Sequence, residues 1–446
     1  MKMTIRKIIF GIISLLAVLF IIGGEMYSGE ADDEWFIETD LDKYLVHSDE
    51  IDILIASDIH YLSPDLTEGG LLEHSLLTTG DGKITHYSEE IMDAFIEEVL
   101  ERQPDLLVIS GDLTFDGAKQ SHSDMSEKLH ILKENNIDVS VIPGNHDVNV
   151  YSARGFTEDS TYRVDSVSAE EFKTIYSAAG YSQAISQDPN SLSYVTAVSD
   201  DVWVIMLDSN KYALHNQQRK SIPSGVIQEE TLEWLEVVLQ ESRKRGVQPL
   251  VVNHHNFLNH HRSTNNSFTL DNSEEVVGLL NRYGVNLAFS GHIHLQHIAN
   301  EGDFHDIASG SLSVYPHFVG ELTIRPSKKE LSYETSRLKI SETLTDYSED
   351  FFNEVSRKKV FSHLLYFELE DSVTDMMTDT FVQFNAAYFK GTVNEAYDSI
   401  IASEGFSHWK RISGTRYKDY ILHGLEENRH DSHKFEGSLI SDDRND

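Results

Sequence analysis

Between residues 51 and 291, short apolar segments alternate with segments whose apolar residues recur at helical spacing. The apolar segments predict six strands, at residues 51–57, 105–110, 138–144, 201–208, 249–253 and 285–291. The helical patterns lie at 88–103, around 125–132, at 231–246 and at 273–284. Strands that alternate with helices in this way predict an α/β domain whose strands run largely parallel.

Two further segments complete this domain. Residues 320–326 and 330–338 predict a closing β-hairpin, while 61–87 and 150–200 are long polar insertions between the other elements. The pattern changes near residue 340, where helical spacing takes over, and we place a domain boundary there.

Polar side chains follow five of the predicted strands directly. They are Asp58 and His60, then Asp112, then Asn145 with His146 and Asp147, then His254 and His255, and finally His292 and His294. The carboxyl ends of parallel strands open on one crevice, so we expect five strands to deliver these side chains to one place. Each cluster alone is typical of a turn, a cap or a surface histidine. Together they indicate a metal site built from oxygen and imidazole ligands.

The charge of the chain limits its partners. The net charge is −38, from 74 acidic and 36 basic residues, and such a surface repels nucleic-acid polymers. A small phosphate ester is less affected, because local positive charge at a site can outweigh the overall field. The sequence has no cysteine, which excludes disulfides, thiolate catalysis and cysteine-ligated zinc.

The N-terminal residues carry a targeting signal. Lys2, Arg6 and Lys7 precede an apolar run at 8–24 in which only Ser14 is polar. Its length is at the lower edge of a membrane-spanning helix and exceeds a usual signal-peptide core. We expect an uncleaved signal anchor that holds the body of the protein outside the cytoplasm at the cell membrane. A cleaved signal peptide, which would give a secreted protein, is the alternative.

The order of the polar clusters resembles a known family. Asp-x-His, Gly-Asp, Gly-Asn-His-Asp, His and Gly-His-x-His, found between residues 58 and 294, resemble the calcineurin-like metallophosphoesterase superfamily. The stretches "SGDLTFDG" and "PGNHDV" resemble its bacterial branch of cyclic-nucleotide and glycerophosphodiester phosphodiesterases. The resemblance implies an α/β sandwich of two β-sheets flanked by helices, with a dinuclear metal site. One local departure is Asn256, which stands where such members often have proline.

The resemblance also implies a role for each cluster. One metal would be held by Asp58, His60, Asp112 and His294, and the other by Asp112, Asn145, His254 and His292. The cofactors would be two divalent ions, and Mn, Fe or Zn all fit these ligands. A hydroxide bridging the metals would attack the phosphorus, and His146 would be the general acid that protonates the leaving group.

Three residues near these clusters have less certain roles by sequence. Asp147 either orients His146 or caps the following turn, and Asp116 is a rival orienting group. His255 either touches a substrate phosphate or belongs to the layer of side chains behind the metal ligands.

The last part of the chain is predicted to be a helical appendage rich in aromatic residues. The four expected parts are a signal anchor or signal peptide at 1–24, a linker at 25–50, a metallophosphoesterase domain at 51–340 and a helical C-terminal domain at 341–446. Aromatic side chains give the last part ample apolar area with which to dock. We expect it either to narrow the crevice or to stabilise the fold from a remote position.

These features predict a membrane-tethered dinuclear phosphoesterase, and specifically a phosphodiesterase that acts on small nucleotide-type or glycerol-type esters. A phosphomonoesterase or nucleotidase of the same fold is one alternative. A non-catalytic envelope scaffold stabilised by its metals is the alternative from another class of protein.

Overall fold

A computed structural model describes residues 48–77, 80, 82–264 and 267–439. The predicted signal anchor at 1–24 and most of the predicted linker at 25–50 lie outside these residues. Within the described ranges, no helix combines the length and the apolar character that crossing a bilayer requires.

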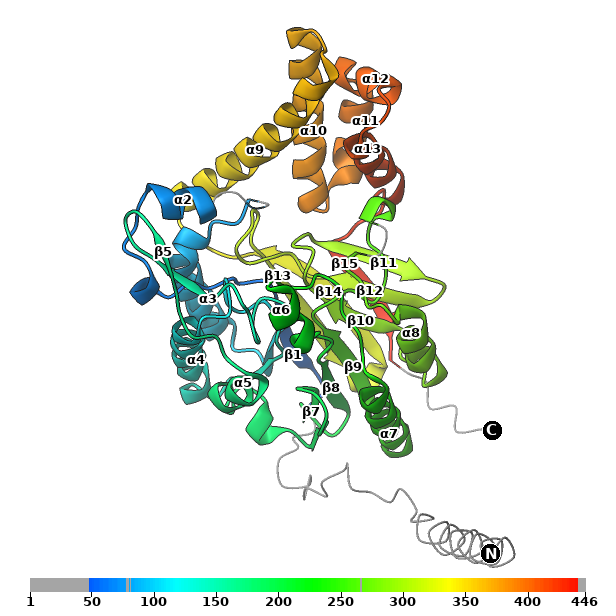
Figure 1. Cartoon of the computed structure of the whole chain (residues 1–446). Helices are drawn as coiled ribbons and strands as arrows, with labels where there is room; N and C mark the ends of the chain where they lie inside the picture. Colours follow the sequence, from blue (N-terminus) through cyan, green and yellow to red (C-terminus); the bar gives the residue numbers. More distant parts are fainter. Residues whose placement is uncertain (1–47, 78–79, 81, 265–266, 440–446) are drawn as a thin grey trace, which may run out of the picture.

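The first sheet has six strands, in the order β15-β14-β13-β1-β2-β3 (Figure 1). In chain order they are β1 (Ile51–Ala56), β2 (Leu106–Ile109), β3 (Asp138–Val141), β13 (Phe318–Arg325), β14 (Glu330–Arg337) and β15 (Lys434–Ser438). β1, β2 and β3 are parallel to one another, whereas β13, β14 and β15 extend the sheet in antiparallel fashion. The parallel part therefore places the ends of three predicted strands side by side.

The second sheet has seven strands, in the order β11-β12-β10-β9-β8-β7-β6. They are β6 (Ser186–Gln187), β7 (Tyr194–Ala197), β8 (Val202–Leu207), β9 (Gln248–Asn253), β10 (Leu287–Ser290), β11 (His297–Glu301) and β12 (Phe304–Ala308). β8, β9, β10 and β12 are parallel, and β6, β7 and β11 are antiparallel at the two edges. A separate two-stranded ribbon consists of β4 (Arg154–Phe156) and β5 (Thr161–Arg163).

Helices cover the outer faces of both sheets. They are α3 (Ser88–Arg102), α4 (Lys119–Glu134), α5 (Ala169–Ile175), α7 (Glu229–Arg245) and α8 (Ser273–Arg282). Two shorter helices, α2 (Leu71–Leu77) and α6 (Tyr212–Gln218), lie in connecting segments. Figure 1 shows α3, α4 and α5 beside the first sheet and α7 and α8 beside the second. The predicted fold class, two sheets flanked by helices with a helical C-terminal part, is thereby confirmed.

The sequence of β8, "VWVIML", shows why the two sheets form layers. Successive side chains of a strand point to opposite faces of its sheet. Val202, Val204 and Met206 enter the large cluster between the two sheets, whereas Trp203 and Ile205 pack in the cluster that contains α7 and α8. All of them are buried. A strand covered on both faces has no polar side, which explains its continuous apolar sequence.

Some strands were not anticipated from the sequence. β6 and β7 lie inside the stretch 150–200, which was predicted to be a polar insertion, and β15 lies inside the predicted helical part. The β15 side chains are partly or fully exposed, so no apolar run marks the strand. β15 pairs with β14 along the edge of the sheet, and backbone hydrogen bonds hold it there.

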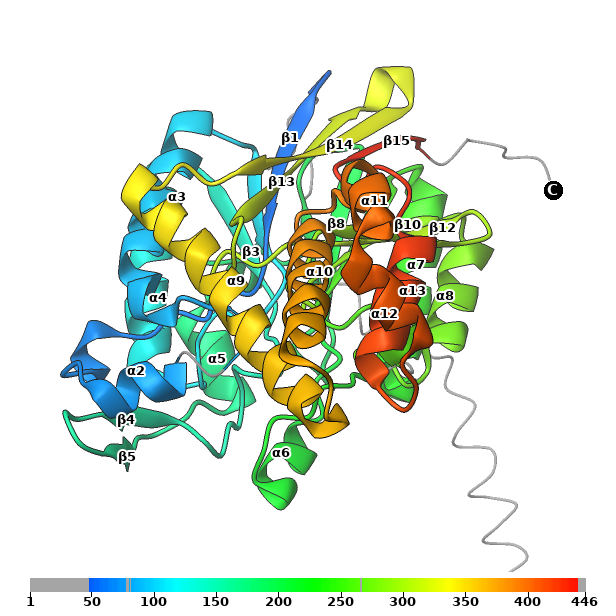
Figure 2. The ribbon, with the colours of Figure 1, turned by 90° about the horizontal axis from the view of Figure 1, so that it is seen from above.

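The C-terminal helices form a second core. They are α9 (Glu342–Leu364), α10 (Asp371–Phe389), α11 (Val393–Ala402), α12 (Glu404–Arg411) and α13 (Arg416–Glu427). Trp409 lies at the centre of this core, fully buried, and its indole N–H donates to the Met377 carbonyl at 2.7 Å. Seen from above, α9 and α10 lie across the molecule between α3 and α4 on one side and α7 and α8 on the other (Figure 2).

The helical part docks on the loops that follow the strands. Ile293 and Leu295, just beyond β10, pack against the helical core. In the loop after β12, Val314 and Tyr315 pack with Phe352 of α9. Of the two positions considered from sequence, the structure thus favours docking at the carboxyl ends of the strands.

The helical core gives a prediction about stability. We expect Trp409→Ala to lower the free energy of unfolding by about 3–5 kcal/mol, because the change leaves a large cavity and removes the hydrogen bond to the Met377 carbonyl. Urea denaturation of the purified protein measures the change. Tyr366→Ala is the control, because Tyr366 is 85% exposed, and its effect should stay within about 0.5 kcal/mol. Similar losses in the two variants would contradict the described packing.

Candidate metal centre

Five strand ends bring the predicted site residues together. β1 leads to Asp58 and His60, β2 to Asp112, β3 to Asn145 and His146, β9 to His254, and β10 to His292 and His294. All of these side chains are buried except His146, which is partly exposed. The loops are joined directly, since the Asp58 N–H donates to the Gly111 carbonyl at 3.1 Å and the His60 N–H donates to the Asp112 carbonyl at 3.0 Å.

The backbone at the site adopts a conformation that side chains usually avoid. Five of the seven predicted metal ligands have a positive φ, namely Asp58 at 53°, His60 at 48°, Asp112 at 48°, His292 at 71° and His294 at 62°. Such residues cost free energy and persist only where the surroundings hold them. With this backbone, the five side chains meet in two clusters at the ends of the strands.

Two glycines make room for this arrangement. A Cβ atom at Gly144 would overlap the Asp112 carboxylate, and one at Gly291 would overlap Ser57 and the Asp58 carboxylate. The Gly residues of the "GNHD" and "GHIH" motifs are therefore required by close packing around the carboxylates.

The first cluster contains Asp58, His60, Asp112 and His294, and one ligand atom from each lies within 4.8 Å of the others. The Nε2 atoms of His60 and His294 are 3.1 Å apart, and His294 Nε2 is 3.3 Å from Asp58 Oδ1. Asp58 Oδ2 accepts hydrogen bonds from Ser57 and from the His292 backbone, whereas its buried Oδ1 has no hydrogen-bond partner. A buried carboxylate oxygen facing two imidazole nitrogens fits a divalent cation.

The second cluster contains Asp112, His254 and His292, again within 4.8 Å. Asn145 joins it, because its Oδ1 is 3.2 Å from His254 Nε2. The Nδ1–H of His254 donates to the Ser110 carbonyl at 2.8 Å, and the Nε2–H of His292 donates to the Pro223 carbonyl at 2.6 Å. The other two nitrogens, His254 Nε2 and His292 Nδ1, then face each other at 3.1 Å, and each can bind a cation when it carries no proton. This pair also fits a bound cation.

The charges in the site favour a cation. Burial would raise the pKa of Asp58, but His294 and His254 outweigh it and hold that pKa below its usual value. Burial alone would lower the pKa of His254, yet the Asp112 carboxylate raises it to about 9. Asp112 therefore attracts positive charge to the space beside His254, and a metal ion that binds there replaces the proton.

His146 stands beside the clusters without belonging to either. Its backbone N–H donates to Asp112 Oδ1 at 2.8 Å, and its ring centre lies 5.2 Å from that of His60. The ring Nδ1–H donates to the Phe115 carbonyl at 3.0 Å. Nε2 is left as the ring nitrogen that can exchange a proton with a ligand in the crevice.

The two proposed orienting carboxylates have other partners. Asp147 accepts hydrogen bonds from the backbone of Leu113 and Thr114 and, at 2.8 Å, from Gly144. It ties the loop after Asp112 to its own loop, so neither sequence interpretation of Asp147 describes its contacts. Asp116 pairs with Arg154 at 2.8 Å and accepts from Ser152, so it does not hold His146. The group that orients His146 is a backbone carbonyl, which no residue pattern can reveal.

His255 and Asn256 support the second cluster. The His255 ring centre lies 4.8 Å from that of His292, and its Nδ1–H donates to Ser209 Oγ at 2.8 Å. The Asn256 amide donates to Ser290 Oγ at 2.8 Å and to the Gly291 carbonyl at 3.1 Å. In this chain, the residue that departs from the family pattern binds the loop that carries His292.

Lys83 is a functional candidate that the sequence did not reveal. It forms a β-bridge with Val314, and its charge is close enough to the site to lower the pKa of His60, after the larger effect of burial. Lys83 lies inside the polar insertion 61–87, between the motif that ends at His60 and the motif that contains Asp112. No spacing rule connects it to them, and only the folded loop brings it near.

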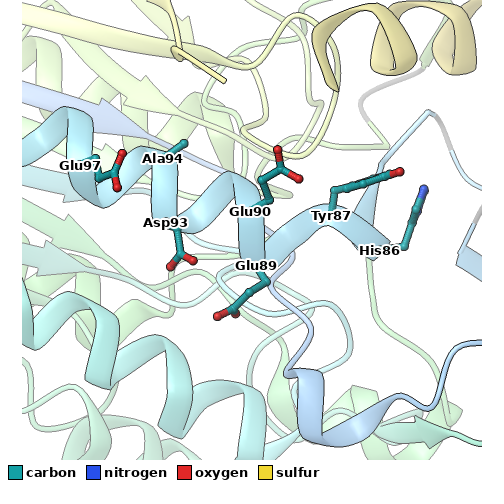
Figure 3. Close-up of a pocket in the computed structure, with 7 residues that line it drawn as sticks. All are labelled: His86, Tyr87, Glu89, Glu90, Asp93, Ala94 and Glu97. Carbon is teal, nitrogen blue, oxygen red and sulfur yellow. The ribbon is translucent and has the colours of Figure 1, made fainter. Parts of the chain in front are cut away.

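A hollow of about 530 Å³ lies beside α3, and none of the candidate metal ligands lines it (Figure 3). Glu89, Glu90, Asp93 and Glu97 line it together with His86 and Tyr87. Four carboxylates repel a phosphate ester, so this hollow is not a candidate for its binding.

Two known protein families match parts of the chain. Residues 51–296 match the family described as calcineurin-like phosphoesterase, and residues 343–431 match the C-terminal domain of cyclic nucleotide phosphodiesterase. A dimetal phosphatase from Danio rerio is similar in structure, with 14% identity and a TM-score of 0.45 over 65% of this chain and 99% of that chain. A putative 5′-nucleotidase from Staphylococcus aureus gives 14% identity and a TM-score of 0.36 over 69% and 58% of the two chains.

No match was found among curated protein sequences. The family match nevertheless covers more than half of the chain and contains every predicted metal ligand. The chain therefore belongs to the calcineurin-like phosphoesterases, a family of enzymes that hydrolyse phosphate esters.

Proposed function

We propose that this protein is a dinuclear metal-dependent phosphodiesterase that acts on small diesters. The observation that carries the proposal is that the two clusters of candidate ligands share Asp112. One metal is assigned to Asp58, His60, Asp112 and His294, and the other to Asp112, Asn145, His254 and His292. A carboxylate common to both clusters can neutralise part of the repulsion between two divalent ions.

The ligand types suit an anionic substrate. When bound, two divalent cations polarise the phosphoryl oxygens and make water a better nucleophile at neutral pH. Asn145 contributes a neutral amide oxygen where a carboxylate would cancel part of the positive charge. Lys83 adds a cation beside the His60 cluster, which favours the approach of phosphate.

His146 is assigned the role of general acid. The Phe115 carbonyl engages Nδ1–H, so the proton given to the leaving oxygen comes from Nε2. The backbone bond to Asp112 holds the residue beside the clusters, so its position is coupled to that of the shared carboxylate. A partly exposed ring can regain its proton from solvent after each turnover.

The substrate class is proposed on two grounds. The helical match is to a domain of cyclic nucleotide phosphodiesterase, and the helices dock beside His292 and His294 through Ile293. Helices docked at the ends of the strands favour small nucleotide-type or glycerol-type diesters as substrates. The net charge of −38 disfavours nucleic-acid polymers.

We further propose that residues 8–24 tether the enzyme to the cell membrane, with its catalytic domain outside the cytoplasm. The proposal is supported by the apolar run and by the basic residues that precede it. Fractionation of cells that produce the full chain, with and without residues 1–24, tests this proposal.

The first prediction concerns metal content. We expect the purified protein to hold two metal ions per chain and Asp112→Asn to lose activity and retain less metal, because one change weakens both clusters. Elemental analysis and phosphodiester hydrolysis before and after chelation measure these effects. Asp138→Asn is the matched control, because Asp138 is exposed at the opposite end of β3 and pairs with Lys133. A single metal in fully active enzyme would rule out the dinuclear assignment.

The second prediction concerns His146. We expect His146→Ala to keep its metal ions and to lose roughly 10²–10⁴-fold in kcat for diesters with alkoxide leaving groups. The loss should be much smaller for nitrophenolate, which leaves without a proton. His130→Ala serves as the control, because His130 is an exposed histidine on α4. An equal loss for both kinds of leaving group would argue against His146 as the acid.

The third prediction concerns substrate class. We expect kcat/KM for methyl p-nitrophenyl phosphate to exceed that for p-nitrophenyl phosphate, which shares its leaving group but is a monoester. Both are measured with the same enzyme and metal supply. A clear preference for the monoester would replace the proposed function with that of a phosphomonoesterase or nucleotidase, and hydrolysis of neither by metal-loaded protein would support a scaffold.

A further inference from the structure

The structure contains a cavity of about 270 Å³ between the helical part and the catalytic domain. Its walls come from α9, α10, α13 and the short helix η5 (Arg262–Thr264), which lies on the loop after β9. Figure 1 shows α9, α10 and α13 gathered on one side of the two sheets. Neither the candidate metal ligands nor His146 line this cavity. The proposed catalytic roles therefore do not explain it.

The cavity has aromatic walls. Phe381, Tyr417 and Tyr420 line it together with Phe389. The Phe381 ring lies 5.2 Å from that of Tyr417 at 89°, and 5.9 Å from that of Tyr420 at 35°. Tyr417 and Tyr420 are partly exposed, and one face of the Tyr420 ring already stacks on His261. Aromatic walls of this kind bind nucleobases by stacking, whatever the sequence of the ligand.

A buried amide supplies polar recognition. Asn385, 8% exposed, accepts a hydrogen bond from Tyr420 Oη at 2.8 Å and donates one to Ser356 Oγ at 2.9 Å. An amide has two N–H donors and two carbonyl lone pairs, so one of each remains beyond these two bonds. A donor beside an acceptor matches the edge of a nucleobase, and glycerol lacks such an edge.

The charge of the cavity is opposite to that of the whole chain. Lys359 and Arg416 line it, and none of the described residues that line it is acidic. The Arg416 guanidinium lies 5.5 Å from the centre of the Tyr417 ring, and across the described part of the chain no carboxylate forms an ion pair with it. In a protein with a net charge of −38, a cavity lined by two cations and by aromatic rings favours an anionic, aromatic ligand.

A chain of packing contacts links the cavity to the candidate metal centre. Tyr420 stacks on His261 with ring centres 4.8 Å apart, and His261 lies on the loop that begins at His254. Further along the same loop, the Phe268 ring lies 5.5 Å from that of His292. Ile293 packs in the cluster that contains Phe381. One loop thus contacts a metal-ligand candidate and supports a wall of the cavity.

We propose that this cavity binds the base of a nucleotide-type diester whose phosphate lies at the metal centre. The inference rests on the proposed phosphodiesterase function and narrows it from nucleotide-type or glycerol-type esters to nucleotides. The size of the cavity is near the lower limit of ligand pockets, about 300 Å³, so it accepts one base and excludes a stacked pair.

The test compares two diesters that share a leaving group. Thymidine 5′-(p-nitrophenyl phosphate) carries a base, and methyl p-nitrophenyl phosphate does not. We expect Tyr417→Ala to lower kcat/KM for the thymidine diester by roughly 5- to 100-fold, the usual effect of losing a base-stacking side chain. The methyl diester should change less than about twofold. Tyr417→Phe, which keeps the ring, should restore the ratio of the two values.

Two variants at exposed arginines keep the test valid if Tyr417→Ala fails to fold. Arg416→Ala removes an exposed side chain of the cavity, and Arg411→Ala removes an exposed arginine on α12 outside it. We expect only Arg416→Ala to lower the preference for the thymidine diester. Binding of thymidine 5′-monophosphate to chelator-treated protein, measured by calorimetry, should weaken in Arg416→Ala and Tyr417→Ala and stay unchanged in Arg411→Ala.

The outcomes separate this inference from the proposed function. If both diesters are hydrolysed and neither their ratio nor the affinity for thymidine 5′-monophosphate changes in Tyr417→Ala and Arg416→Ala, the cavity does not bind the base and the phosphodiesterase function stands. If neither diester is hydrolysed, the proposed function fails, whereas altered binding of the monophosphate would still identify the cavity as a nucleotide site.

Discussion

The Asp112 carboxylate is the contact on which the rest of the site depends. One of its oxygens accepts the His146 backbone N–H and faces His254, and the other faces His60. Three strands of the first sheet and one of the second therefore meet at a single side chain. The backbone of Gly144 lies directly against this carboxylate, and a Cβ atom at Gly144 would overlap it. Asp147 holds the next two residues, Leu113 and Thr114, through their backbone N–H groups.

This arrangement requires backbone strain, and the sandwich supplies the rigidity to maintain it. A residue held at positive φ costs about 1–3 kcal/mol, and five of the predicted ligands are held in this way. The strands that precede them are buried on both faces and cannot yield without opening a close-packed core. The stability of the layers is thus used to hold a geometry that the local sequence would not adopt alone.

The sequence predicted the parts of the molecule that repeat a periodic or positional rule. Continuous apolar runs such as "VWVIML" predict buried strands, and residues directly after strands, such as Asp58 and His292, converge because parallel strands end at one edge. β15 escaped prediction because its pairing uses backbone atoms and its side chains carry no apolar pattern. Lys83 and the Phe115 carbonyl were not predicted for related reasons, since Lys83 lies in a polar insertion without a motif and a backbone carbonyl belongs to no residue type.

The segment 292–295 links the two cores of the protein. His292 and His294 belong to the metal clusters, whereas Ile293 and Leu295 between and beyond them pack in the helical core. A displacement of α10 or α13 that moved Ile293 would also move the two imidazoles beside it, because they are consecutive along one backbone. The helical part is therefore coupled by packing to the segment that carries two candidate metal ligands. This coupling gives a physical reason for a catalytic domain to keep a helical partner docked at the ends of its strands, where it helps to determine the position of two candidate ligands.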